Sequence, residues 1–104
     1  MNRAEEINKM IQEAGTMMEG EDEAYIGAYF YAPENRVKMT VAEGGSLAAL
    51  TFLVARIILC IATTHEVKPM ALMNLIRRAL KLMIKYHKKG VPIGEIETRN
   101  LGIH

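Results

Sequence analysis

The spacing of hydrophobic positions near the N-terminus predicts an amphipathic helix over residues 3–18. Apolar side chains recur there three and four residues apart, while Glu6, Lys9 and Glu13 fall away from that stripe. The helix is expected to end before the Gly-Glu-Asp-Glu run at 20–23, which interrupts the pattern. The apolar stripe consists of Ile7, Met10, Ile11, Ala14, Met17 and Met18.

Residues 24–41 alternate with a period of two and predict an antiparallel β-hairpin, with a turn at Ala32-Pro33-Glu34-Asn35. One face has no polar side-chain atoms, so we expect it to cover the helices. A two-stranded hairpin is marginal alone, so it must pack on helices or join a larger sheet with a second chain. The apolar face holds Ile26, Ala28, Phe30, Val37, Met39 and Val41, and the other face holds Tyr25, Tyr29, Tyr31, Arg36, Lys38 and Thr40.

Residues 46–64 are apolar all round the helical wheel and carry one charge, Arg56. Ser46 is a suitable N-cap for a helix there. Such a helix must be buried on every side, and 104 residues supply few elements to surround it, so we predict a homo-oligomer. We expect Leu47, Leu50, Val54, Ile57, Ile58 and Ile61 to pack within the chain, and Phe52, Leu53, Arg56 and Cys60, with Ala49 and Thr63, to contact another subunit.

The same segment is a poor membrane span. Its apolar core, 47–62, is short against the roughly 20 residues that a span needs. Arg56 near the middle adds about 2.5–3.5 kcal/mol to the free energy of insertion. The start of the chain is polar and acidic, unlike a secretory signal. Cys60 is the sole cysteine and lies among apolar residues, which fits a reducing compartment. We therefore expect a cytoplasmic protein with no membrane partner.

A third helix is predicted over residues 69–89, with Pro69 at its first position and Gly90 after its end. The remaining tail, 90–104, has no helical period. It is expected to be an extended arm on a neighbour, an added strand or a disordered segment. The fold class is thus α+β, with one domain over 1–104. The expected apolar stripe of the third helix is Leu72, Ile76, Ala79, Leu80, Met83 and His87, opposite Asn74, Arg77, Arg78, Lys81, Lys85 and Lys88.

The net charge of +1 hides an uneven distribution. Residues 1–23 contain two basic and seven acidic side chains, whereas residues 67–94 contain seven basic side chains and no acid. One interpretation is that the acidic end is solvated or pairs with the basic end. The other is that the basic end binds acidic partners or nucleic acid.

Two surfaces are candidates for partner or nucleic-acid binding. Tyrosines among cations on a strand can stack single-stranded bases, although tyrosine also suits protein interfaces and half-exposed strands. The predicted helix over 69–89 has the positive charge of a recognition helix that lies in the major groove of DNA. The helix before it is too apolar to lie on DNA, however, and Asn74 is almost the only side chain suited to reading bases. We favour a protein interface or a solvated face for both. The candidate residues are Tyr25, Tyr29, Tyr31, Arg36, Lys38, Arg77, Arg78, Lys81 and Lys85.

Arg56 is the one candidate for a small-ligand site. A buried arginine needs a partner, either a carboxylate such as Glu43 or Glu66, or an anion held between subunits. The Gly44-Gly45-Ser46 turn lacks the features of a phosphate-binding loop, and an N-cap explains it. The three histidines are dispersed, and no catalytic or metal-ligating spacing occurs, so we expect no enzyme activity, metal or cofactor.

Three functions follow, in order of preference. The first is a small non-enzymatic homo-oligomer that acts by binding another macromolecule. The second is a nucleic-acid-binding regulator that uses the basic helix or the tyrosine face. The third is a protein that sequesters or senses an anion between subunits through Arg56.

Overall fold

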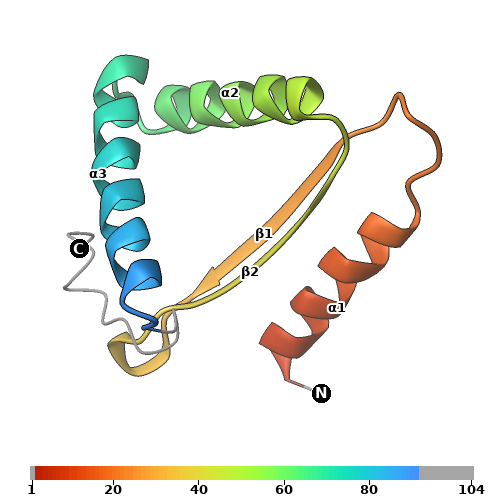
Figure 1. The fold of residues 1–104 in the computed structure, drawn as a ribbon, viewed down its shortest axis with the longest axis horizontal. Coiled ribbons are helices and arrows are strands. Elements are labelled where there is room, and N and C mark those ends of the chain that lie inside the picture. The colour runs from red at the N-terminus through yellow and green to blue at the C-terminus, as the bar shows by residue number, and fades with distance from the viewer. Residues whose placement is uncertain (1, 92–104) are drawn as a thin grey trace. The chain divides into compact units, whose positions relative to one another are not determined.

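The computed structural model describes residues 2–91 and confirms the α+β layout of a helix, an antiparallel hairpin and two further helices (Figure 1). The predicted tail lies outside the described residues from position 92 onward. The elements are α1 (Arg3–Thr16), β1 (Tyr25–Tyr31), the single 3-10 turn η1 (Pro33–Asn35), β2 (Lys38–Gly44), α2 (Leu47–Thr64) and α3 (Pro69–Lys88).

The described residues form two compact units. The first contains 2–31 and 39–56, that is α1, β1, most of β2 and the first half of α2. The second contains 32–38 and 57–91, that is the hairpin turn, the second half of α2 and α3. The single domain over 1–104 stays a prediction.

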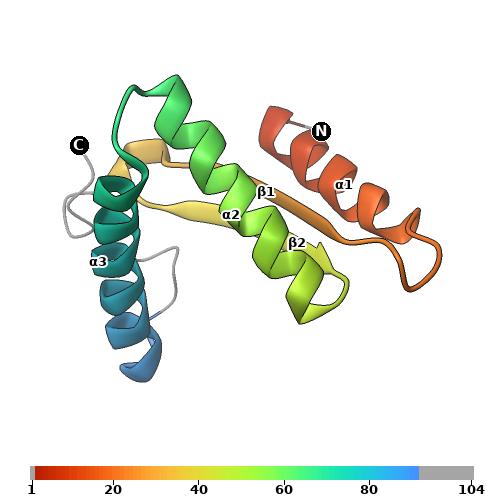
Figure 2. The same ribbon diagram turned by 90° about the horizontal axis from the view of Figure 1, so that it is seen from above.

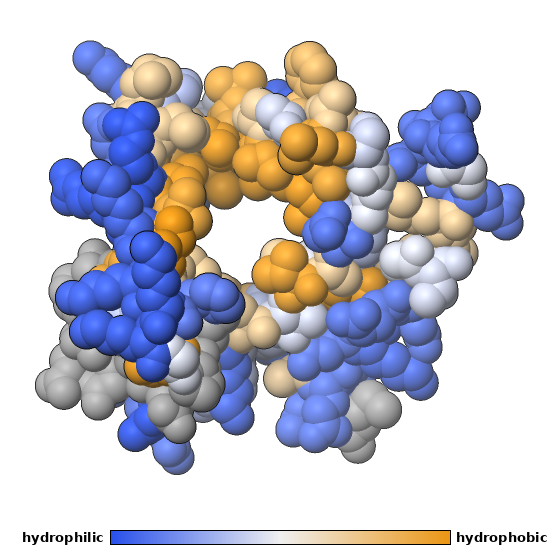
Figure 3. Space-filling view, viewed as in Figure 1, coloured by the Kyte–Doolittle hydropathy of each residue, from blue (hydrophilic) through white to orange (hydrophobic). Residues whose placement is uncertain are grey.

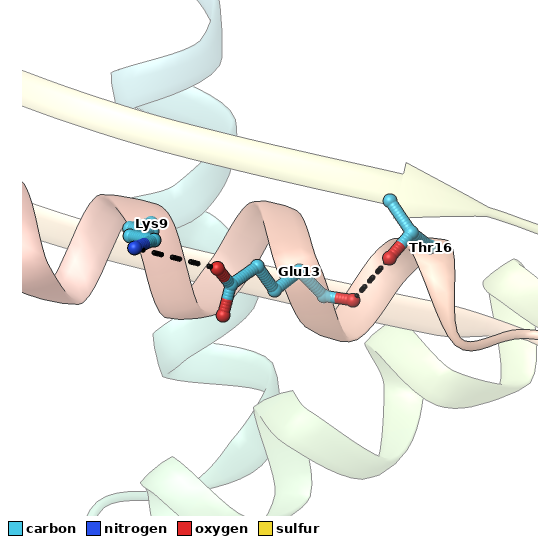
Figure 4. A network of polar contacts seen from close by, with 3 residues as sticks. All are labelled: Lys9, Glu13 and Thr16. Atoms are coloured by element: carbon cyan, nitrogen blue, oxygen red, sulfur yellow. Dashed lines mark hydrogen bonds and ion pairs between the residues drawn. The ribbon is translucent and has the colours of Figure 1, made fainter.

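Local hydrogen bonds define α1. The Asn2 side chain caps it by accepting from the Glu5 backbone N–H at 2.9 Å, and Glu5 and Glu6 suit the positive end of the helix dipole. Near the other end, the Thr16 hydroxyl donates to the Glu13 carbonyl at 2.7 Å, and Lys9 Nζ lies 3.8 Å from the Glu13 carboxylate (Figure 4). This exposed pair adds little stability.

In the first unit, α1 packs along the hairpin, as both ribbon views show (Figures 1 and 2). The Tyr25 hydroxyl donates to the Ile11 carbonyl of α1 at 2.8 Å, and the Thr40 hydroxyl donates to the Asn8 side chain at 2.6 Å. Gly27 makes room for this contact, because a Cβ there would lie 2.8 Å from Tyr25 Cζ and 3.0 Å from Ile11 Cγ2. The helix therefore covers the face of Tyr25, Gly27 and Thr40.

This packing places α1 on the tyrosine face, which was not the face expected to cover the helices. The predicted apolar face is covered in part: Val37 is buried, Ile26 and Met39 are half-buried, and Ala28, Phe30 and Val41 are exposed. Phe30 is 49% exposed and Val41 is 63% exposed. The physical reason is that Gly27 allows close approach of the helix, while the Tyr25 ring packs and its hydroxyl finds a backbone acceptor.

The connection between β2 and α2 is shorter than predicted. The strand continues to Gly44 rather than ending at 41, and α2 begins at Leu47. The Ser46 hydroxyl accepts from the Ala49 backbone N–H at 3.1 Å, which confirms Ser46 as the N-cap. Gly45 has φ +125°, and a Cβ there would lie 2.7 Å from Ala24 Cβ, so only glycine fits this turn.

In the second unit, backbone hydrogen bonds cap the C-terminal ends of α2 and α3. After α2, Glu66 adopts φ +55° and the Val67 N–H donates to the Ala62 carbonyl at 3.0 Å. After α3, Gly90 adopts φ +71° and the Val91 N–H donates to the Tyr86 carbonyl at 3.0 Å, as the predicted terminal glycine implies. Among residues 2–91 only Val37 and Ala62 are buried hydrophobic side chains, so the core is very small.

Candidate interaction surfaces

Helix α2 exposes apolar side chains around most of its circumference. Of its 18 residues only Ala62 is buried, while Leu47 is 81% and Phe52 is 79% exposed. Figure 3 shows hydrophobic side chains gathered along this helix. By length and composition α2 is also a helix that could cross a membrane, which by itself is weak evidence for a span. A helix of this composition needs an apolar neighbour on several sides.

Burial does not separate the two predicted faces of α2. From the face expected inside the chain, Leu50 and Ile58 are half-buried, but Leu47, Val54, Ile57 and Ile61 are exposed. Four of the six residues expected to pack within the chain are thus exposed. From the face expected at a subunit interface, Phe52, Arg56 and Cys60 are exposed and Leu53 is half-buried. The interface role of these four residues stays a prediction.

Arg56 is exposed in the single chain, which removes the premise that it is a buried charge. Within residues 2–91, the pair of Lys9 and Glu13 is the only ion pair, so Arg56 forms no bridge there to Glu43, Glu66 or an N-terminal carboxylate. A bridge from Arg56 to a carboxylate of another subunit stays a prediction. An anion held by Arg56 at a subunit boundary stays a prediction.

The tyrosine face does not lie open as a whole. Tyr25 is half-buried, and its hydroxyl is engaged by α1. Tyr29 and Tyr31 stack with ring centroids 6.3 Å apart, and Tyr31 is exposed. Arg36 and Lys38 are exposed but belong to the other compact unit. Tyr25 is thus partly used within the chain, and nucleic-acid or partner binding by the tyrosine face stays a prediction.

Helix α3 is amphipathic, with a basic side that is fully displayed. The expected stripe is largely right, but Leu80 and His87 are exposed, while Met73, Leu82 and Tyr86 are half-buried in addition to the predicted positions. In Figure 3 hydrophilic side chains cover one side of this helix and hydrophobic ones another. A hollow beside the basic side is lined by Lys81, Ile84, Lys85, Lys88 and Lys89. We call Arg77, Arg78, Lys81, Lys85, Lys88 and Lys89, all exposed, the basic stripe.

Sequence reasoning missed the uncovered face of the hairpin, where Ala28, Phe30 and Val41 are exposed. Gly27 within the Tyr-Ile-Gly-Ala-Tyr stretch was the available signal, since a glycine inside a strand often marks close approach of another element. The exposed apolar face and α2 together leave much hydrophobic surface in contact with water.

The described part of the chain, 2–91, contains no group of three or more His, Cys, Asp or Glu side chains arranged to hold a metal ion. Its most distinctive features are the exposed apolar α2 and the basic stripe. A scan against protein-family models, a search of curated proteins and a search of solved structures each found no match.

Proposed function

We propose that this protein is a small, non-enzymatic, self-associating protein that acts by binding another macromolecule. The exposed helix α2 carries the proposal. Its apolar residues face water in the single chain, with one buried position among 18. Exposed apolar area costs about 25 cal/mol per Å² relative to burial, and patches of this kind mark association surfaces.

A second copy of the chain is the partner that best fits this surface. Most soluble oligomers are formed by identical chains with closed symmetry. Each copy brings a second uncovered apolar surface of its own, the hairpin face with Phe30 and Val41. Self-association would thus bury apolar area from both helix and strand, as obligate interfaces do.

Sedimentation equilibrium at about 50 μM, a concentration matched to micromolar association, tests the proposal. The wild type should be oligomeric, and Phe52→Glu should shift it toward monomer because a charge would be buried at the interface. Met17→Glu is the matched control, since Met17 is 77% exposed and is the C-cap residue of α1 rather than part of α2. A monomeric wild type, or equal behaviour of both variants, would refute the proposal.

A second candidate is membrane association, which the length and exposure of α2 favour. The two candidates predict different effects of Arg56→Leu on binding to lipid vesicles. In a membrane span, Arg56 near the centre adds about 2.5–3.5 kcal/mol to insertion, so its removal should increase binding to lipid vesicles. A soluble oligomer should stay at the bottom of the flotation gradient in both forms. Flotation with neutral lipid vesicles, without detergent, distinguishes them.

The nucleic-acid alternative draws support from the exposure of the basic stripe. Binding through phosphates falls steeply as salt increases, because counterions are released. A salt titration with a DNA duplex of random sequence therefore tests it. Absence of binding at about 50 mM salt would leave self-association as the better account.

A further inference from the structure

The two compact units carry opposite net charge. The first, residues 2–31 with 39–56, contains 3 basic and 8 acidic side chains, for a net −5. The described part of the second, residues 32–38 with 57–91, contains 9 basic and 2 acidic side chains, for a net +7. A nearly neutral chain is thus strongly polarised, which affects how two copies can approach one another.

The acidic charge includes a segment beside the start of α2. We call Glu19, Glu21, Asp22 and Glu23, all exposed, the acidic segment. Its position follows from Gly45, two residues before α2, where a Cβ would lie 3.0 Å from the Glu23 carbonyl oxygen. The Glu23 end of the acidic segment therefore lies beside the turn that leads into α2.

The basic charge follows the other end of α2. The chain turns at Glu66 and Val67, and α3 begins at Pro69, five residues after α2 ends at Thr64. Arg77, the first residue of the basic stripe, comes eight residues later, roughly 12 Å along the helix axis. The turn before α2 thus lies beside one end of the acidic segment, and the chain after α2 leads into the basic stripe of α3.

We propose that α2 pairs antiparallel with α2 of a second copy, so that the acidic segment of each copy faces the basic stripe of the other. The inference rests on the proposed self-association and specifies its orientation. Antiparallel pairing brings the N-terminal end of one α2 beside the C-terminal end of the other, and two-fold symmetry repeats the favourable contact. Parallel pairing would oppose acid with acid and base with base, and like-charge juxtaposition is unfavourable.

Charge reversal with mixing tests the orientation. One variant carries Glu21→Lys and Asp22→Lys, and the other carries Lys81→Glu and Lys85→Glu. Each alone should associate at least about tenfold more weakly than wild type at low salt, because like charges then face each other. An equimolar mixture of the two should recover wild-type association to within about threefold, since both contacts in the mixed dimer become favourable again.

A matched control separates position from net charge. Arg3→Glu with Lys9→Glu removes the same number of cations from α1, outside the basic stripe, and should associate like wild type. Circular dichroism checks that all variants keep their helices. Raising salt from about 50 to 500 mM should weaken wild-type association and abolish the difference between the variants.

Each other outcome overturns the orientation in a distinct way. If wild type is oligomeric but the mixture associates no better than either variant alone, self-association stands and the antiparallel charge pairing fails. If the stripe variant associates normally but loses salt-dependent binding to a random DNA duplex, the stripe is a nucleic-acid surface instead. If wild type is monomeric throughout, the proposed function itself fails.

Discussion

The chain itself provides the surface on which α1 packs, namely the hairpin, whereas most side chains of α2 are exposed. Tyr25 and Thr40 each donate a hydrogen bond to α1, and Gly27 provides the space. Helix α2 is far more apolar, yet Leu47 and Phe52 are almost fully exposed. The hydrophobic effect is proportional to the apolar area removed from water, so composition alone stabilises nothing until a surface covers it. Changes near α1 should therefore affect the single chain, and changes on α2 should affect association.

The largest effect is expected for Gly45→Ala, at the turn that joins the hairpin to α2. The new Cβ would meet the Ala24 Cα at 2.8 Å and would occupy a backbone conformation with φ +125°. Strain of about 1–3 kcal/mol and a similar overpacking term add to a loss of roughly 2–6 kcal/mol in the free energy of unfolding. Urea denaturation measures it, and Gly20→Ala, with φ +92° but open space around it, isolates the strain.

Gly27→Ala should come next, with a loss of about 1–3 kcal/mol. The added methyl group would collide with the Tyr25 ring and with Ile11, and so would push α1 away from the hairpin. Gly44→Ala is the control, because a Cβ there meets only Met18 Cε at an ordinary 3.8 Å. Equal melting temperatures for the two variants would show that α1 does not pack on this face.

Tyr25→Phe removes one hydroxyl and keeps the ring. The Ile11 carbonyl would lose a partly buried donor at 2.8 Å, so we expect a loss of about 0.5–1.5 kcal/mol. Tyr31→Phe, on the exposed neighbour, should change stability by less than about 0.5 kcal/mol. Denaturant titrations at low protein concentration compare them, and a reversed order would contradict the reported orientation of the hairpin.

The smallest effect on the single chain is expected on α2. Leu47→Ala should change the free energy of unfolding by less than about 0.5 kcal/mol at submicromolar concentration, because Leu47 is 81% exposed. At high concentration the same variant should lower the melting temperature, since an interface contact would be lost. A large loss at every concentration would mean that the chain covers α2 by itself.

Sequence patterns were sufficient for the elements of this protein. Helical periodicity located α1 and α3, two-residue alternation located the hairpin, and Ser46 and Gly90 marked helix ends that the structure bears out. Local propensity and capping act within a few residues, so a sequence read in short windows contains the needed information. The same local reasoning ended β2 three residues early, because the Glu43–Gly44 pair looked like a break rather than a strand end.

Only the tertiary structure shows which surfaces of the chain pack against one another. Hydrophobicity favoured the face with Phe30 and Val41 as the inner face of the hairpin, yet α1 lies on the tyrosine face. That choice depends on the space at Gly27 and on a hydrogen bond between residues 14 positions apart, neither of which a periodic pattern contains. For α2 the sequence alone determined that an apolar helix forms and needs covering. In the described chain only Ala62 of α2 is buried, because burial depends on the neighbours present and not on composition.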